Sequence, residues 1–96
     1  QSLCAWATSD KSGISMKMYT TQPGVQLYTG NFLQDCPSPG KGGAPLQKYS
    51  GFALETQHFP CSPSHSEFPS TLLRAGKVFR ANTTLRFFTG RQCGRL

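Results

Sequence analysis

Residues 14–29 read ISMKMYTTQPGVQLYT, two short extended segments on either side of a Pro-Gly turn. Apolar side chains recur at every second position up to Met18, which predicts a half-buried strand over residues 14–20. Pro23 and Gly24 are typical turn residues, and residues 25–29 resume an extended pattern after them. This stretch predicts strand, turn and strand, and the rest of the chain likewise consists of short extended segments interrupted by glycine and proline.

Two further segments have the same short, extended character, residues 52–57 and 83–88. Helical periodicity is hard to find, because Gly or Pro interrupts the chain before a 3.6-residue apolar stripe can form. Residues 34–48 and 59–69 are rich in proline and predict two long loops. We therefore expect an all-β fold, a sandwich with long connections. We expect most of the aromatic side chains in its core.

Length and charge limit the possible functions. The chain has 96 residues and a formal charge of +6, so it forms one domain at most. No apolar run approaches the roughly 20 residues that span a bilayer, and we expect no membrane partner. Basic residues interleave with phenylalanine in the last quarter, from Arg74 to Arg95, but no nucleic-acid-binding motif accompanies them. We expect a solvated strand face there and no nucleic acid.

The four cysteines leave two interpretations open. Cys4, Cys36, Cys61 and Cys93 fit a secreted, disulfide-stapled basic module that binds polyanions, and the alternative is four free thiols. No pair has the spacing of a zinc ribbon, and Cys61 with His65 would give only two ligands, so we expect no metal.

Among the few acidic residues, Glu55 is the candidate for chemistry. Asp10, Asp35 and Glu67 lie in predicted turns or loops, where solvated roles are expected. Glu55 lies inside a predicted strand with neutral neighbours. It is either a solvent-facing residue of an amphipathic strand or a carboxylate held rigidly for general base work. One strand does not decide between them.

Neutral amides and histidines complete the candidates. Gln22, Gln26 and Gln57 adjoin predicted strand ends, and an amide can both donate to and accept from a hydroxyl-rich ligand. His58 and His65 lie beside proline in irregular stretches, where surface or loop-packing roles are expected.

Three blocks in order resemble the C-terminal part of the aldose 1-epimerases, the galactose mutarotases. Residues 20–33, TTQPGVQLYTGNFL, are similar to that family's TTQPGVQFYTGNFL. Residues 48–60, KYSGFALETQHFP, resemble its KHSGFCLETQ and following FP segment. Residues 62–76, SPSHSEFPSTLLRAG, resemble its DSPNHPNFPSTLLRPG stretch. Together these blocks are far more specific than an isolated short motif.

The resemblance implies a fragment of a galactose-mutarotase-like β-sandwich that interconverts the α and β anomers of hexoses such as galactose or glucose. It makes Glu55 the general base and Gln26 a sugar-hydroxyl contact, and it implies no cofactor and a cytoplasmic location. The family's acid histidine and its other sugar-binding residues have no counterpart here, and His58 and His65 match loop positions instead.

We therefore expect residues 1–96 to be the C-terminal part of one sandwich domain, with an unmatched tail at 88–96. Cys61, Ser66 and Ala75 depart from the family's usual residues. The chain alone is expected to be inactive, and its expected partners are a hexose and the missing N-terminal portion of the fold. The alternatives are a non-catalytic carbohydrate-binding remnant and the stapled module.

Overall fold

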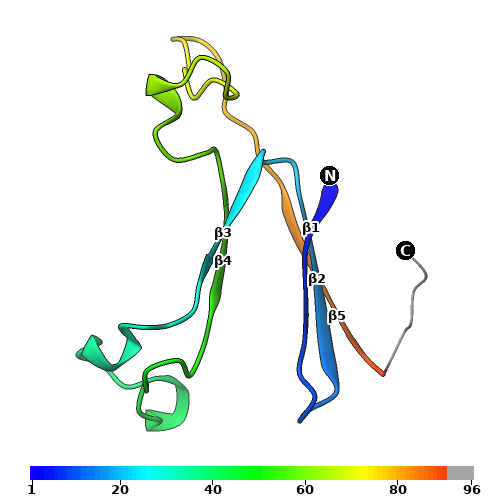
Figure 1. Ribbon diagram of the computed structural model, residues 1–96, viewed down its shortest axis with the longest axis vertical. Helices are drawn as coiled ribbons and strands as arrows, with labels where there is room; N and C mark the ends of the chain where they lie inside the picture. Colours follow the sequence, from blue (N-terminus) through cyan, green and yellow to red (C-terminus); the bar gives the residue numbers. More distant parts are fainter. Residues whose placement is uncertain (91–96) are drawn as a thin grey trace. The chain divides into compact units, whose positions relative to one another are not determined.

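The computed structural model describes residues 1–90 and divides the chain into two compact units. Unit 1 comprises Gln1–Val25 and Thr56–Leu96, and unit 2 comprises Gln26–Glu55. The strands, drawn in Figure 1, are β1 (Ser2–Thr8), β2 (Ile14–Thr20), β3 (Gly24–Tyr28), β4 (Ala53–Gln57) and β5 (Thr83–Thr89). Three single helical turns of the 3-10 type are η1 (Leu33–Asp35), η2 (Lys41–Gly43) and η3 (Ser62–Ser64). The described part is therefore all-β, as its sequence predicts.

The larger sheet has the strand order β1-β2-β5, and both pairs are antiparallel. A tight turn closes the first pair, because Ser9 N–H donates to the Ile14 carbonyl at 3.0 Å and Gly13 N–H to the Ser9 carbonyl at 2.9 Å. Gly13 has φ +72°, a left-handed conformation that glycine adopts without a Cβ clash. This turn places β1 beside β2.

The second pair joins strands that are far apart in sequence. Thr21 N–H donates to the Asn82 carbonyl at 3.1 Å, and Asn82 N–H donates to Thr21 Oγ1 at 3.0 Å. The buried Thr20 hydroxyl donates to the same Asn82 carbonyl at 3.2 Å and accepts Gln22 N–H at 3.0 Å. These bonds fix the register at which β5 begins.

The smaller sheet pairs β3 with β4. Gly24 lies against the Gln57 carbonyl at one end, and Gly30, just past β3, lies against the Gly51 carbonyl at the other. Gly24 at the start of β3 thus lies beside Gln57 at the end of β4, so the pair is antiparallel. The predicted strands at 25–29 and 52–57 are confirmed with boundaries shifted by one residue.

The sequence did not predict strand β1, and the expectation that most aromatic side chains lie in the core is wrong. Residues of β1, with the sequence SLCAWAT, were not predicted as a strand, because small and apolar residues there follow no clean polar alternation. The aromatic side chains do not form a core: Trp6, for example, is 44% exposed and Phe87 is 62% exposed. Among residues 1–90 the only buried hydrophobic side chain is Met18, because each small sheet leaves broad faces uncovered.

Candidate functional site

Glu55 occupies the centre of β4. Its neighbours Leu54 and Thr56 are half-buried, whereas Glu55 itself is exposed. The strand therefore holds the carboxylate in a fixed direction, but within this chain the carboxylate stays in water. Of the two interpretations of Glu55, the solvent-facing one describes its surroundings here.

Gln26 lies across the sheet from Glu55. In an antiparallel pair, each step forward along β3 corresponds to one step backward along β4. Gly24 lies beside Gln57, so Gln26, two residues later, lies opposite Glu55. The contact of Gly30 with Gly51 gives the same register. Side chains directly opposite each other share a face, with Cβ atoms about 4.5–5.5 Å apart. Both side chains are exposed. Unit 2 thus presents a carboxylate and a neutral amide together on one rigid surface.

The loop between β3 and β4 is closed at its base by contacts of Gly30 with Leu33, Tyr49 and Gly51, and we call this base the loop neck. The Gly30 carbonyl accepts Tyr49 N–H at 2.9 Å and Leu33 N–H at 3.3 Å. Gly30 is buried with φ +80°, and a Cβ on it would lie 2.4 Å from the Gly51 carbonyl oxygen. Tyr49 also adopts a positive φ, 63°, which is uncommon for a non-glycine residue. The neck needs glycine at position 30 to bring the strand ends this close.

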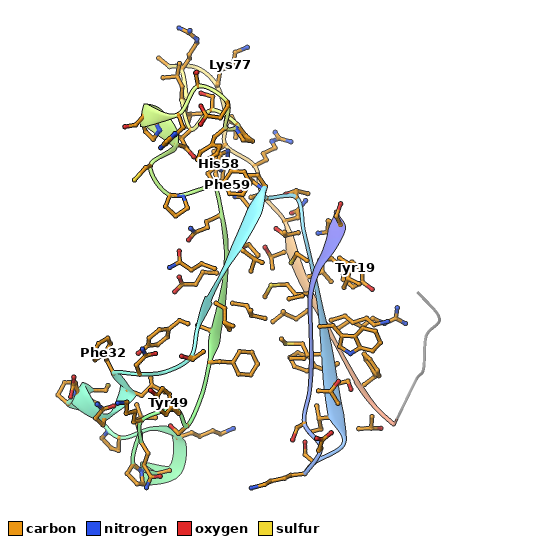
Figure 2. All side chains as sticks on the ribbon, in the orientation of Figure 1. Tyr19, Phe32, Tyr49, His58, Phe59 and Lys77 are labelled. Carbon is orange, nitrogen blue, oxygen red and sulfur yellow. The ribbon has the colours of Figure 1, made fainter. Side chains whose placement is uncertain are left out.

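Tyr28 ties the first turn of the loop to β3. Its hydroxyl accepts Phe32 N–H at 3.0 Å, and the Thr29 hydroxyl donates to Asn31 Oδ1 at 2.9 Å. Phe32 and Tyr49, labelled in Figure 2, both lie on this loop and are 67% and 63% exposed. Alternation along β3 puts Tyr28 on the same face as Gln26, so the tyrosine helps to shape the surface beside the candidate pair.

The two histidines lie in unit 1, after β4. His58 is half-buried. His65 Nδ1 lies 3.0 Å from Glu67 Oε1, and its ring centroid is 4.9 Å from that of Phe68. These contacts hold the loop around η3 in shape, where His65 and Phe68 border a hollow in the surface. Glu67, expected to be solvated, is exposed but has a partner.

The other acids remain at the surface. Asp10 lies in the turn between β1 and β2, and Asp35 ends η1; both are exposed. Within residues 1–90 no group of three or more His, Cys, Asp or Glu is arranged to hold a metal ion. None of the helical turns in that range has the length and apolarity of a membrane-spanning helix.

Cys4, Cys36 and Cys61 are free thiols, and the Cys4 thiol donates to the Met18 carbonyl at 3.4 Å. Cys61 has φ 60°, in the left-handed region. Cys93 and the basic residues Arg91 and Arg95 lie outside the described residues.

Sequence reasoning missed one cluster on the larger sheet. Lys17 Nζ lies 4.3 Å from the centroid of the Trp6 ring and 5.6 Å from that of Phe88. Register explains it, because Lys17 pairs with Trp6 on one side and with Arg86 on the other. Only strand pairing between distant segments reveals this cluster, so the sequence offered no local signal for it.

Comparison with known proteins decides the family. The aldose 1-epimerase family profile matches residues 1–86, which include all of β1 to β4 and the start of β5. The chain belongs to the aldose 1-epimerase family. Its all-β sheets are accordingly a portion of a galactose-mutarotase β-sandwich.

Named relatives support the same assignment. The chain is 48% identical over 84 residues to galactose mutarotase of Mus musculus and 48% identical to that of Homo sapiens, covering 88% of this chain and 24% of each relative. It is 38% identical to aldose 1-epimerase of Escherichia coli K12, covering 85% of this chain and 23% of that protein. The chain thus spans about a quarter of the length of the curated relatives it matches.

Proposed function

We propose that this chain supplies the general base of an aldose 1-epimerase reaction, the interconversion of the α and β anomers of a hexose such as galactose or glucose. Glu55 is the base, and Gln26 binds a sugar hydroxyl. Membership of the family supports the reaction class. The single observation that carries the assignment is the alignment of exposed Gln26 with exposed Glu55 across the β3-β4 pair.

The proposed chemistry begins at the anomeric hydroxyl. The Glu55 carboxylate removes the O1 proton, the C1–O5 bond breaks, and the ring oxygen takes a proton from an acid, which the family resemblance makes a histidine. The open-chain aldehyde rotates about C1–C2. Closure on the other face reverses both proton transfers and returns Glu55 to its starting state. The step needs one base and one acid on opposite sides of C1, with no net change in protons.

Gln26 has a different task. Its amide can donate to one sugar oxygen and accept from another hydroxyl, and because it stands level with Glu55 it can fix the sugar relative to the base. Orientation of this kind lowers the entropic part of the barrier. Gln26 thus contributes binding and alignment, whereas Glu55 takes part in proton transfer.

The chain alone does not complete the reaction. His65 is paired with Glu67 in the loop around η3, and neither His65 nor His58 matches the position of the family's acid. Polarimetry of freshly dissolved α-glucose or α-galactose with this chain should therefore show only the spontaneous rate. An acceleration that Glu55→Gln abolishes would contradict this part of the proposal.

A non-catalytic carbohydrate-binding role is the second candidate. The exposed Gln26 and Glu55 side chains favour it, because they form a polar surface that a hexose can contact without being converted. Titration of galactose into the chain by calorimetry, paired with polarimetry, separates the two roles. Binding at this pair without turnover, even after the rest of the fold is supplied, would favour the second.

We also propose a cytoplasmic location. The free thiols of Cys4, Cys36 and Cys61 suit a reducing compartment and disfavour the disulfide-stapled module. Thiol titration of the denatured chain tests this: four reactive thiols are expected, and two or none would contradict the reduced state.

A further inference from the structure

One face of the larger sheet carries two basic side chains among aromatic rings. The register places Lys17 on the central strand between Trp6 on β1 and Arg86 on β5, and alternation along β5 puts Phe88 on the same face as Arg86. We call this surface the cationic face; it consists of Trp6, Lys17, Tyr19, Thr84, Arg86 and Phe88. Trp6 and Arg86 are both exposed, so a ligand in solution can reach the ring and the guanidinium.

Two aromatic rings hold the Lys17 ammonium in place. Lys17 Nζ lies 4.3 Å from the centroid of the Trp6 ring and 5.6 Å from that of Phe88. A cation over an aromatic ring is attracted by the negative ring face. The rings therefore orient the positive charge of Lys17 but do not neutralise it.

Lys17 and Arg86 lie directly opposite each other, which is unfavourable for two like charges. All four acidic residues of the chain are among the described residues, and none of them lies on β1, β2 or β5. Within residues 1–90 the only ion pair joins His65 to Glu67. The sheet thus keeps two adjacent positive charges where one opposite charge would be more stable, and a cost in stability of this kind is common at functional surfaces.

We propose that the cationic face binds an acidic, extended peptide segment of another protein. The Arg86 guanidinium can bind a carboxylate through two parallel hydrogen bonds, and the Lys17 ammonium supplies a second cation beside it. Tryptophan and arginine are also enriched among the residues that contribute most to the binding energy of protein interfaces. The inference is independent of the proposed function, because neither Glu55 nor Gln26 takes part in it.

A single-stranded nucleic acid fits the cationic face less well than an acidic peptide. Its bases stack on the free faces of aromatic rings. Lys17 lies over one face of the Trp6 ring, and the Trp6 and Phe88 rings are tilted by 55° to each other, so they are not parallel platforms for successive bases. Carboxylates need only the two cations, which this face presents side by side.

The test is binding of the whole chain to a fluorescein-labelled peptide that alternates glutamate with threonine, measured by fluorescence anisotropy. The chain should bind this peptide, more weakly as salt is added, and should not bind a matched peptide that alternates glutamine with threonine. Arg86→Glu should weaken binding at least about tenfold. Its thermal unfolding temperature should stay the same or rise, because the repulsion from Lys17 is removed, so the loss of binding is not a loss of folding.

Two further variants complete the test. Lys77→Glu makes the same charge change at an exposed position outside the strands and should leave the affinity within about threefold. Arg86→Gln removes the charge without reversing it, which covers the case in which Arg86→Glu disturbs the sheet, and it should weaken binding by more than about threefold.

The proposal would be overturned if the glutamate peptide did not bind, if the glutamine peptide bound equally well, or if Arg86→Glu and Lys77→Glu caused equal losses. Tighter binding of an oligothymidine of the same charge as the glutamate peptide would also overturn it, because that result would assign the cationic face to nucleic acid.

Discussion

Gly30 lies so close to Gly51 that a Cβ at position 30 would be 2.4 Å from the Gly51 carbonyl oxygen. This contact closes the loop neck at the end of the β3-β4 pair. The neck fixes the alignment of the strands, and the alignment puts Gln26 beside Glu55. Two glycines with no chemistry of their own therefore position the candidate site.

Gly30→Ala should open the neck. The substitution places a methyl group against backbone and forces alanine into a left-handed conformation, so we expect a loss of about 3 kcal/mol or more in local stability. Hydrogen exchange of the Tyr49 amide, which donates to the Gly30 carbonyl, measures the effect directly.

Gly42→Ala is the matched control. Gly42 also has a positive φ, 69°, but a Cβ there meets nothing within 4 Å, so only the conformational cost of about 1 kcal/mol remains. Equal effects of the two substitutions would show that the close contact with Gly51 is unimportant.

Arg86→Glu should stabilise the larger sheet. Arg86 lies directly opposite Lys17, and like charges in that position are unfavourable, whereas an opposite charge is favourable. We expect a gain of about 0.5–1 kcal/mol in the free energy of unfolding, falling as salt is added. Lys77→Glu makes the same charge change at an exposed position outside the strands and should give a smaller shift.

Thr20→Val should destabilise the junction between β2 and β5. The buried Thr20 hydroxyl donates to the Asn82 carbonyl and accepts Gln22 N–H, so its loss removes the acceptor of Gln22 N–H and leaves the Asn82 carbonyl with only its bond from Thr21 N–H. The expected cost is about 1–3 kcal/mol, measured by thermal unfolding. Thr89→Val, at an exposed position of β5, should cost less than about 0.5 kcal/mol, and a similar loss at both positions would contradict the assignment.

The sequence predicted the strands that alternate and the loops that contain proline. Alternation up to Met18 identified β2, and the Gly and Pro residues located the turns. It could not predict β1, whose small residues gain their strand character from pairing with β2. Nor could it predict that Lys17 would stand between Trp6 and Arg86, because register between distant strands is set by tertiary pairing.

The candidate site was predicted in part. Glu55 and Gln26 were identified through the family resemblance, and the polar character of their strand faces followed from period two. Their alignment depends on the glycine contacts at both ends of the pair, which no local pattern reveals. The exposure of Glu55 likewise depends on what covers the strand, and its local neighbours on β4 and β3 leave it exposed.

Mutarotation by the complex of this chain with Mus musculus galactose mutarotase from which the matched 84 residues have been deleted is the most direct test of Glu55 as the base. With the unmodified chain, polarimetry should show an accelerated approach of α-galactose to equilibrium. With Glu55→Gln, which keeps the size and removes the carboxylate, the rate should fall by about 10²–10⁴-fold while the complex remains intact. An intact complex whose rate is unchanged by Glu55→Gln would contradict the central claim.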